Sequence, residues 1–306
     1  MSQKIVFMGT PEFSVPTLKS LLNSDHEILA VYSQPASKAN RGQKIISSRI
    51  EVFAKENSLR VRTPVNLDTD EEYNYLKKLK PDIVIVIAYG KIIPKRFLSL
   101  SKNGFINVHA SLLPKWRGAA PLQRSIMNQE KETGISIMKI IEELDAGPIC
   151  KTYNLEILEN ENVESLSERL SLLAAKKILD DIDEILEDKA VFKSQEDLKA
   201  TYANKILKSE GKIDWSEPVK KIIGKINGLY PNSFFIYKGE RYKILKAEIS
   251  NKIGEIGSVL SDSLDVGCKN GSIKILEIQR EGKRPQKINE FLLGSKIIKG
   301  SNLKDA

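Results

Sequence analysis

The feature that most constrains the fold is the alternation of strand and helix patterns over the first 190 residues. Residues 82–89 are apolar on both faces of an extended chain, as in a strand at the centre of a parallel sheet. Similar strand patterns at residues 4–9, 27–33 and 105–110 are separated by helical patterns, such as residues 14–23, where Ser14 is the expected N-terminal cap. This order predicts an α/β domain with a doubly wound, mostly parallel, Rossmann-like sheet.

The pattern changes after about residue 190. Residues 193–206 have the composition of a linker, and two hairpins follow, at residues 232–249 and 265–279. The hairpins turn at the pairs Lys238-Gly239 and Asn270-Gly271. We therefore predict a catalytic domain over residues 1–190, a linker over residues 191–206, and a small OB-like β-barrel domain over residues 207–306.

The positive charge is concentrated in one part of the chain. Residues 201–306 carry 20 Lys and Arg against 12 Asp and Glu, which equals the net charge of +8 of the whole sequence. Residues 28–50 and 83–129 contain no acidic residue. This distribution indicates a polyanionic partner such as RNA. Lysines that only cover solvated faces would explain the composition equally well.

Other features narrow the class of protein. The apolar run at residues 83–88 is too short to cross a bilayer, and the first ten residues lead directly into a strand pattern. The two cysteines, Cys150 and Cys268, lack any metal-binding spacing. We expect buried reduced thiols in a cytoplasmic protein, with no bound metal, no membrane association and a monomeric state.

The first strand–helix turn, GTPEFSVP, argues against a nucleotide cofactor. A dinucleotide-binding turn needs closely spaced glycines and free backbone N–H groups. Here Pro11 and Pro16 remove two of those donors.

Three polar residues form a candidate catalytic set at the carboxyl ends of predicted strands. Asn107 and His109 are two residues apart in a strand and therefore share one face. The turn at residues 141–147 brings Asp145 to the same edge of the sheet. An amide, an imidazole and a carboxylate can together transfer an acyl group directly to an amine. Taken singly, each residue also fits a structural role in a strand end or a turn.

Longer motifs extend this set into a family resemblance. The chain resembles the methionyl-tRNA formyltransferases, within the wider family of folate-dependent formyltransferases. The matching stretches are MGTPEFSVPTL, VYSQP with RGQK, IVIVIAYGKIIP, NVHASLLPKWRGAAPLQRSI, TGISIMKI with LDAGPI, and TYANKI with IDWS. The catalytic set of that family falls on Asn107, His109 and Asp145.

The resemblance implies transfer of the formyl group of 10-formyltetrahydrofolate to the α-amine of methionyl initiator tRNA, giving N-formylmethionyl-tRNA for translation initiation. It implies folate contacts from two segments that flank the catalytic strand, and these are Ile87, Ala88, Tyr89, Ser111, Leu112, Leu113 and Pro114. The stretch at residues 34–49 resembles a loop that enters the tRNA acceptor stem, with Arg41 and Lys44 as its tRNA-binding cations. The OB-like domain over residues 207–306 is expected to bind tRNA as well, because it carries the excess positive charge.

Three alternatives stay open at this point. The catalytic stretch also resembles formyltransferases for nucleotide-linked amino sugars and formyltetrahydrofolate hydrolase domains. A catalytically silent RNA-binding protein would share the charge distribution. The charge excess and the RGQK stretch favour tRNA, and the presence of all three catalytic residues argues against a silent protein.

Overall fold

The computed structural model describes residues 2–39, 44–295 and 297–304. Contacts divide the chain into two compact units. The first comprises Met1–Ala119, Thr133–Leu155 and Ser167–Ala203, and the second comprises Ala120–Glu132, Glu156–Leu166 and Asn204–Ala306. This division is discontinuous in sequence, so the predicted boundaries at residues 190 and 206 stay predictions.

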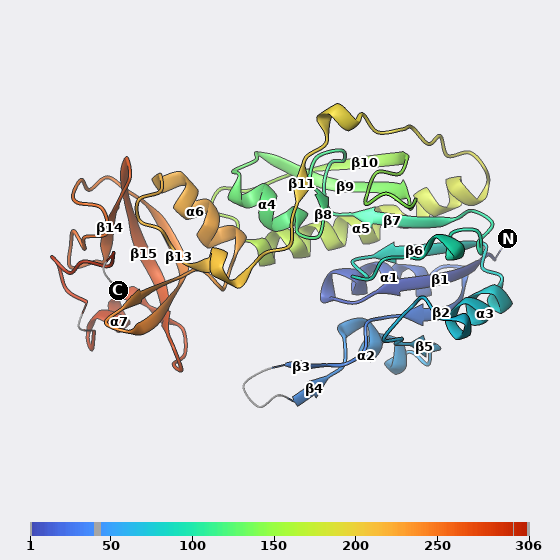
Figure 1. Cartoon of the computed structure of the whole chain (residues 1–306), viewed down its shortest axis with the longest axis horizontal. Helices are drawn as coiled ribbons and strands as arrows, with labels where there is room; N and C mark the ends of the chain where they lie inside the picture. Colours follow the sequence, from blue (N-terminus) through green and yellow to red (C-terminus); the bar gives the residue numbers. More distant parts are fainter. Residues whose placement is uncertain (1, 40–43, 296, 305–306) are drawn as a thin grey trace. The chain divides into compact units, whose positions relative to one another are not determined.

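The first unit is built on a seven-stranded sheet with the order β10-β9-β7-β6-β1-β2-β5 (Figure 1). Its strands are β1 (Lys4–Gly9), β2 (Glu27–Tyr32), β5 (Val61–Arg62), β6 (Ile83–Ile87), β7 (Phe105–His109), β9 (Glu132–Lys139) and β10 (Ile149–Glu156). Pairs β1–β2, β2–β5, β1–β6 and β6–β7 are parallel, whereas β9 runs antiparallel to β7. The predicted mostly parallel α/β sheet is confirmed.

Strand β6 lies between β1 and β7, and all five of its residues are buried. This burial explains its uninterrupted apolar sequence, because helices cover both faces of such a sheet. The helices of this unit are α1 (Val15–Leu22), α2 (Arg49–Glu56), α3 (Asp70–Leu79) and most of α5 (Val163–Leu186), with 3-10 turns η1 (Glu12–Ser14), η2 (Lys95–Phe97) and η3 (Asp197–Lys199).

Side-chain caps begin two of these helices. Ser48 accepts a hydrogen bond from the Glu51 N–H, and Thr69 accepts one from the Glu72 N–H. Ser14 differs from the expected cap of α1, since its hydroxyl makes no capping bond and instead donates to the Ile87 carbonyl over 2.8 Å. The serine thus joins the first turn to the end of β6.

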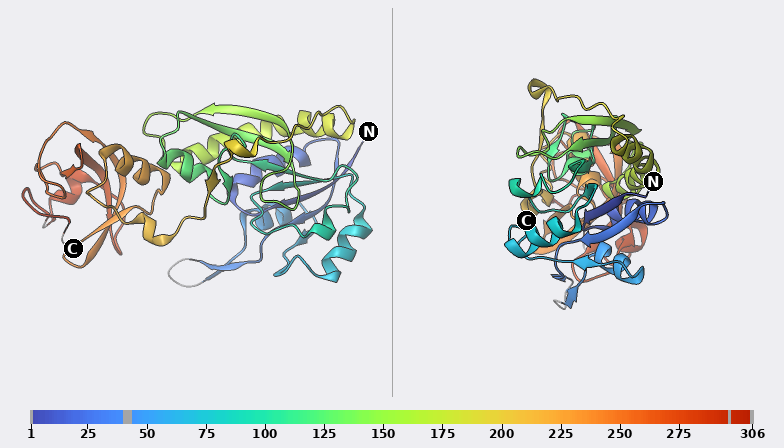
Figure 2. Two further views of the ribbon diagram at one scale, coloured as in Figure 1. Left: turned by 45° about the horizontal axis from the view of Figure 1, so that its top comes forward. Right: turned by 90° about the vertical axis from the view of Figure 1, so that its right-hand side faces the viewer.

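The polar stretch that begins at residue 34 is predicted to be a loop, but it includes two short strands. Strands β3 (Ser37–Ala39) and β4 (Lys44–Ile46) pair in antiparallel fashion, and the described part of this hairpin extends away from the seven-stranded sheet (Figure 2). Three-residue strands with mixed polarity leave too little periodicity for a sequence pattern to reveal them.

Most of the predicted linker, up to Ala203, lies in the first unit. Lys193 bridges to Ile149, and β11 (Tyr202–Ala203) pairs in parallel with β8 (Arg117–Gly118). Residues 193–203 therefore make backbone pairs within the first unit, and the linker over residues 191–206 stays a prediction. The segment is held by backbone and polar side-chain contacts, which produce no apolar periodicity in the sequence.

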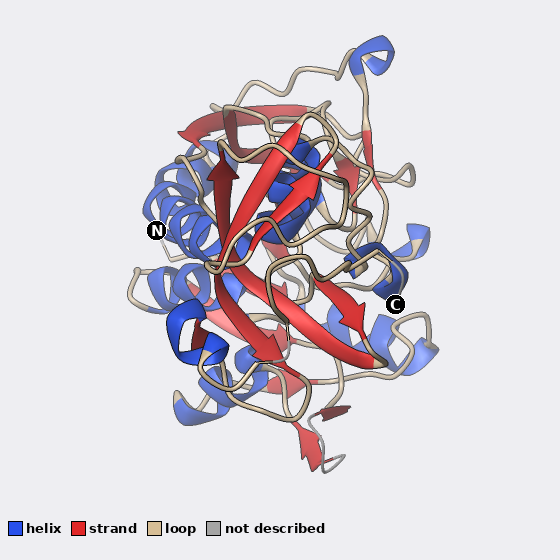
Figure 3. Cartoon of the chain, turned by 90° about the vertical axis from the view of Figure 1, so that its left-hand side faces the viewer, coloured by secondary structure: helices blue, strands red, loops and turns tan. Residues whose placement is uncertain are grey.

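The second unit contains an antiparallel sheet with the order β12-β13-β15-β14, and β16 adds to β15 (Figure 3). Its elements are α4 (Pro121–Met127), η4 (Lys208–Gly211), α6 (Val219–Gly228), β12 (Phe234–Tyr237), β13 (Glu240–Ser250), β14 (Asp265–Cys268), β15 (Gly271–Arg280), β16 (Gln286–Lys287) and α7 (Ile288–Leu292). Both predicted hairpins are present, and Lys238, Gly239 and Asn270 have the positive φ that their tight turns require. The unit agrees with the predicted small barrel-like domain.

Both cysteines are free thiols, but Cys150 is only half-buried, whereas Cys268 is buried as expected. Among the described residues, no helix combines the length and apolar character that a membrane span requires.

Candidate active site

The three candidate catalytic residues meet at the carboxyl end of β7. Asn107 and His109 lie on β7, and Asp145 lies in the turn between β9 and β10 with a left-handed φ of 49°. The His109 side chain is 6% exposed and that of Asp145 is 15% exposed. The ionisable members of the set are therefore largely shielded from water.

Asp145 connects the other members of the site. Its Oδ1 accepts a long hydrogen bond of 3.4 Å from Asn107 Nδ2, and its Oδ2 accepts one of 2.9 Å from the Gly118 N–H. His109 Nδ1 lies 3.7 Å from the same Oδ2. This carboxylate thus faces the imidazole and also holds the loop that follows β7.

The second nitrogen of His109 has a specific partner. His109 Nε2 lies 2.9 Å from the Trp116 carbonyl oxygen. A carbonyl oxygen only accepts hydrogen bonds, so Nε2 carries a hydrogen in this arrangement. In a protonated imidazolium, Nδ1 would carry the second hydrogen and direct it toward Asp145. The two ring nitrogens thus face a carbonyl oxygen on one side and a carboxylate on the other.

The Asp145 turn is held at its backbone by a residue that sequence reasoning missed. Gln195 Nε2 donates to the carbonyls of Asp145 and Gly147, each over 2.8 Å. At Gly147 itself, an added Cβ would lie 1.9 Å from the Lys139 carbonyl oxygen, so only glycine fits.

Gln195 is in turn fixed by Arg117, whose side chain is 4% exposed. Arg117 Nε donates to Gln195 Oε1 over 3.0 Å, and Arg117 Nη2 pairs with Asp197 over 2.8 Å. Thr201 Oγ1 accepts from the Trp116 N–H over 2.9 Å. The segment after α5 thereby ties together the two loops that carry the site. A polar run with no apolar pattern gave no local signal for this role.

The segment from Ser111 to Lys115 is held internally. Ser136 Oγ donates to the Ser111 carbonyl and accepts from the Leu113 N–H, over 2.7 and 3.0 Å. Ser111 Oγ donates to the Lys115 carbonyl over 2.6 Å. Ser111 and Leu113 are buried, whereas Leu112 and Pro114 are partly exposed. Of the four predicted folate-binding residues in this segment, Leu112 and Pro114 are therefore the more accessible to a ligand.

The end of β6 has a similar arrangement. Ile87 and Tyr89 are buried, and Ala88 between them is exposed with a φ of 47°. The Tyr89 carbonyl accepts from Thr10 Oγ1 over 2.8 Å and from Gln34 Nε2 over 3.0 Å. The first strand–helix turn thus supports this segment through side chains, in keeping with the absence of a phosphate-binding glycine pattern.

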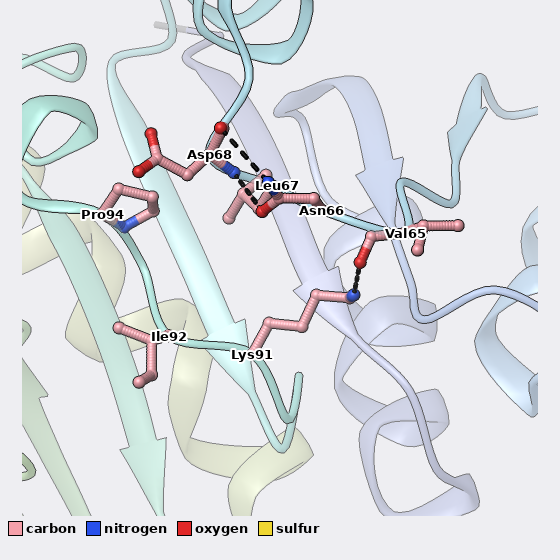
Figure 4. A pocket seen from close by; sticks show the side chains of 7 residues that line it. All are labelled: Val65, Asn66, Leu67, Asp68, Lys91, Ile92 and Pro94. Atoms are coloured by element: carbon pink, nitrogen blue, oxygen red, sulfur yellow. Dashed lines mark hydrogen bonds between the residues drawn. The ribbon is translucent and has the colours of Figure 1, made fainter.

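A cavity of about 370 Å³ opens beyond the carboxyl ends of β5 and β6 (Figure 4). Figure 4 shows Lys91 reaching across it to the Val65 carbonyl, 2.5 Å away. Its lining residues are Val65, Asn66, Leu67, Asp68, Lys91, Ile92 and Pro94. Ligands of open α/β sheets bind at this edge.

The structure does not fully describe the two predicted tRNA-binding residues. Arg41 lies outside the described residues, and the side chain of Lys44 is not described. Within the described ranges, no cluster of three or more His, Cys, Asp or Glu side chains could hold a metal ion. The assignments of all predicted catalytic, folate-binding and tRNA-binding residues stay predictions.

Comparison with known proteins identifies the family. The formyl transferase model matches residues 3–182, and the formyl transferase C-terminal domain model matches residues 205–296. Methionyl-tRNA formyltransferase of Pelagibacter ubique (strain HTCC1062) is 60% identical, covering 99% of each chain. The chain belongs to the methionyl-tRNA formyltransferase family.

Further comparisons agree with this membership. Methionyl-tRNA formyltransferase of Jannaschia sp. (strain CCS1) is 40% identical over 98% of this chain and 99% of its own. The N-formyltransferase of Helicobacter canadensis, solved with folinic acid and dTDP-3-aminofucose, superposes with a TM-score of 0.67. It covers 92% of this chain and 100% of its own at 20% identity, which shows a shared fold alone.

Proposed function

We propose that this methionyl-tRNA formyltransferase family member transfers the formyl group of 10-formyltetrahydrofolate to the α-amine of methionyl initiator tRNA. The single observation that carries the proposal is the convergence of Asn107, His109 and Asp145 on a chain that is 60% identical to a methionyl-tRNA formyltransferase. We also propose that it acts in the cytoplasm, as a monomer and without a metal.

The reaction is direct attack of the methionyl amine on the formyl carbon. The carbonyl oxygen of the formyl group gains negative charge as the tetrahedral intermediate forms. Asn107 donates to this oxygen and His109 takes up a proton, while Asp145 stabilises the charged imidazole. Collapse of the intermediate breaks the bond between the formyl carbon and folate N10, and the proton held by His109 passes to N10.

The folate is proposed to bind along the backbone of Ile87, Ala88 and Tyr89 and of Ser111, Leu112, Leu113 and Pro114. The hydrogen bonds that fix the Tyr89 and Ser111 carbonyls support this proposal, since they present a rigid edge to a flat heterocycle. Lys91, Ile92 and Pro94, which line the cavity, directly follow the Ile87–Tyr89 segment, and the cavity would bind the extended part of the folate. Arg41 and Lys44 are proposed to contact the tRNA acceptor stem.

The test compares acceptors with the purified protein and 10-formyltetrahydrofolate. We expect formylation of methionyl initiator tRNA and no comparable product with a dTDP-linked amino sugar. The amino sugar is the relevant competitor because the N-formyltransferase of Helicobacter canadensis was solved with such a ligand. Formylation of the amino sugar but not of the tRNA would overturn the proposal, as would release of formate with neither acceptor formylated.

A further inference from the structure

The outward face of the β12–β13 hairpin in the second unit gathers positive charge around one aromatic ring. Phe234 pairs with Lys243 across the antiparallel strands and with Lys212 across a parallel bridge. Directly opposed residues share one face of a sheet, so these three side chains form a row. Alternate residues Phe235, Tyr242 and Ile244 point into the hydrophobic core, which places the row on the solvent side.

Arg241 completes this cluster and is held in a fixed orientation. Its guanidinium carbon lies 3.6 Å from the centroid of the Phe234 ring. Stacking on an aromatic face leaves the edges of a guanidinium available for a planar, two-point contact. Arg241 Nε is shielded from water and has no hydrogen-bond acceptor. An unsatisfied buried donor is unfavourable, so this guanidinium has hydrogen-bonding capacity that the protein does not use.

The positive charges of this cluster are not neutralised by the protein. Among the residues that the structure describes, no carboxylate forms an ion pair with Lys212, Arg241 or Lys243. The nearest polar partner of Lys243 Nζ is the neutral Oδ1 of Asn232, at 3.3 Å. Glu281 donates its backbone N–H to the Arg241 carbonyl, but its side chain is exposed. Burial and then the charge of Arg241 lower the pKa of Lys243, as expected for cations held together without an anion.

We propose that Lys212, Arg241 and Lys243 around Phe234 form a contact site for a phosphodiester of the tRNA backbone. The proposal rests on the proposed function, because that function supplies the RNA. Arg241 binds the phosphate through its guanidinium edge, and the two lysines add charge on the same face. The cluster combines three cations with one aromatic residue, which fits a nucleic-acid backbone beside an unstacked base.

The test measures binding of initiator tRNA to the full-length protein over a range of salt concentrations. The variant Arg241→Gln/Lys243→Gln is compared with Lys283→Gln/Arg284→Gln, which removes the same charge from exposed positions of the same unit. We expect the first to weaken binding about 10-fold and to lower the slope of log affinity against log salt by roughly one to two units. The second should weaken binding less than about twofold. Arg241→Lys should keep the salt slope but bind more weakly, because it loses the planar stacked group.

Equal losses in the two double variants would overturn the site, because they would show only nonspecific attraction. No loss in Arg241→Gln/Lys243→Gln would also overturn it and would point to a partner other than RNA. Thermal unfolding of each variant checks that the second unit is folded. Formylation by the unchanged protein separates the two proposals: absence of formylated methionyl-tRNA refutes the proposed function, whereas normal formylation with equal losses refutes this site alone.

Discussion

Replacing Gln195 tests whether the segment after α5 positions the catalytic carboxylate. Gln195→Ala removes two hydrogen bonds, to the carbonyls of Asp145 and Gly147, and the acceptor of Arg117 Nε. Gln195→Glu is the sharper change, because it keeps an acceptor for Arg117 but places an oxygen against the two carbonyls. If the amide donor holds the turn, both variants should be impaired.

The size of the effect follows from these contacts. Two neutral hydrogen bonds contribute about 1 kcal/mol each, and leaving a buried guanidinium N–H unpaired costs about 1–3 kcal/mol. The total of roughly 3–5 kcal/mol is divided between the free energy of folding and the positioning of Asp145. Asp145 has a left-handed backbone conformation, which is unfavourable unless neighbouring contacts hold it. A share of about 1.4–2.8 kcal/mol in the chemical step lowers kcat about 10- to 100-fold.

The assay is steady-state formylation at saturating folate and tRNA, with unfolding by urea measured in parallel. The control is Asp197→Asn, which weakens the outer partner of Arg117 and leaves the turn untouched. The Asp197 side chain is 82% exposed, so its ion pair is worth at most about 1 kcal/mol, and kcat should fall less than about fivefold. Normal kcat in a folded Gln195→Glu protein would refute the positioning role.

Three further predictions concern separate parts of the chain. Arg41→Leu should impair formylation by raising KM for tRNA without lowering the unfolding temperature; an unchanged KM would remove this residue from recognition. Burial raises the pKa of Asp181 above its value in the unfolded chain. The free energy of unfolding therefore falls as the pH rises from the unfolded-state pKa to the folded-state pKa, because the folded protein ionises this carboxyl less readily. Asp181→Asn should therefore gain more unfolding free energy at pH 7 than at pH 4, and equal gains in urea titrations would contradict this. Burial raises the pKa of Cys150 and of Cys268 to about 12. At pH 8 the folded protein should therefore react with a thiol reagent far more slowly than the urea-unfolded protein. Equal reaction rates would contradict the structure.

The sequence predicted the framework of the fold because that framework depends on apolar periodicity and turn chemistry. The buried strand at Ile83–Ile87 and the turn at Asn270-Gly271 both express their surroundings in a few adjacent residues. The same holds for Asn107 and His109, whose alternation in one strand places them on one face. Asp145 was placed correctly near them because the turn at a strand end confines it to one edge of the sheet.

The missed features depend on contacts between distant residues. Gln195 lies 50 residues from Asp145, and Arg117 lies 80 residues from Asp197. Nothing in a polar stretch such as SQEDLK distinguishes a residue that bonds two carbonyls from one that faces solvent. Ser14 shows the same limit, because its position suggested a helix cap, whereas the fold brings the Ile87 carbonyl within reach of its hydroxyl. Loops become predictable only once the sheet has fixed which of them are neighbours.

The most direct test of the central claim is single-turnover formylation of methionyl initiator tRNA with enzyme in excess. Asn107→Ala and His109→Ala are compared with the unchanged protein at saturating 10-formyltetrahydrofolate. We predict that loss of the Asn107 amide slows the chemical step by about 10²–10³-fold and that loss of the His109 imidazole is at least as severe. Binding of the tRNA should change little, because neither side chain is proposed to contact phosphate. A near-normal single-turnover rate for His109→Ala would contradict the assigned chemistry.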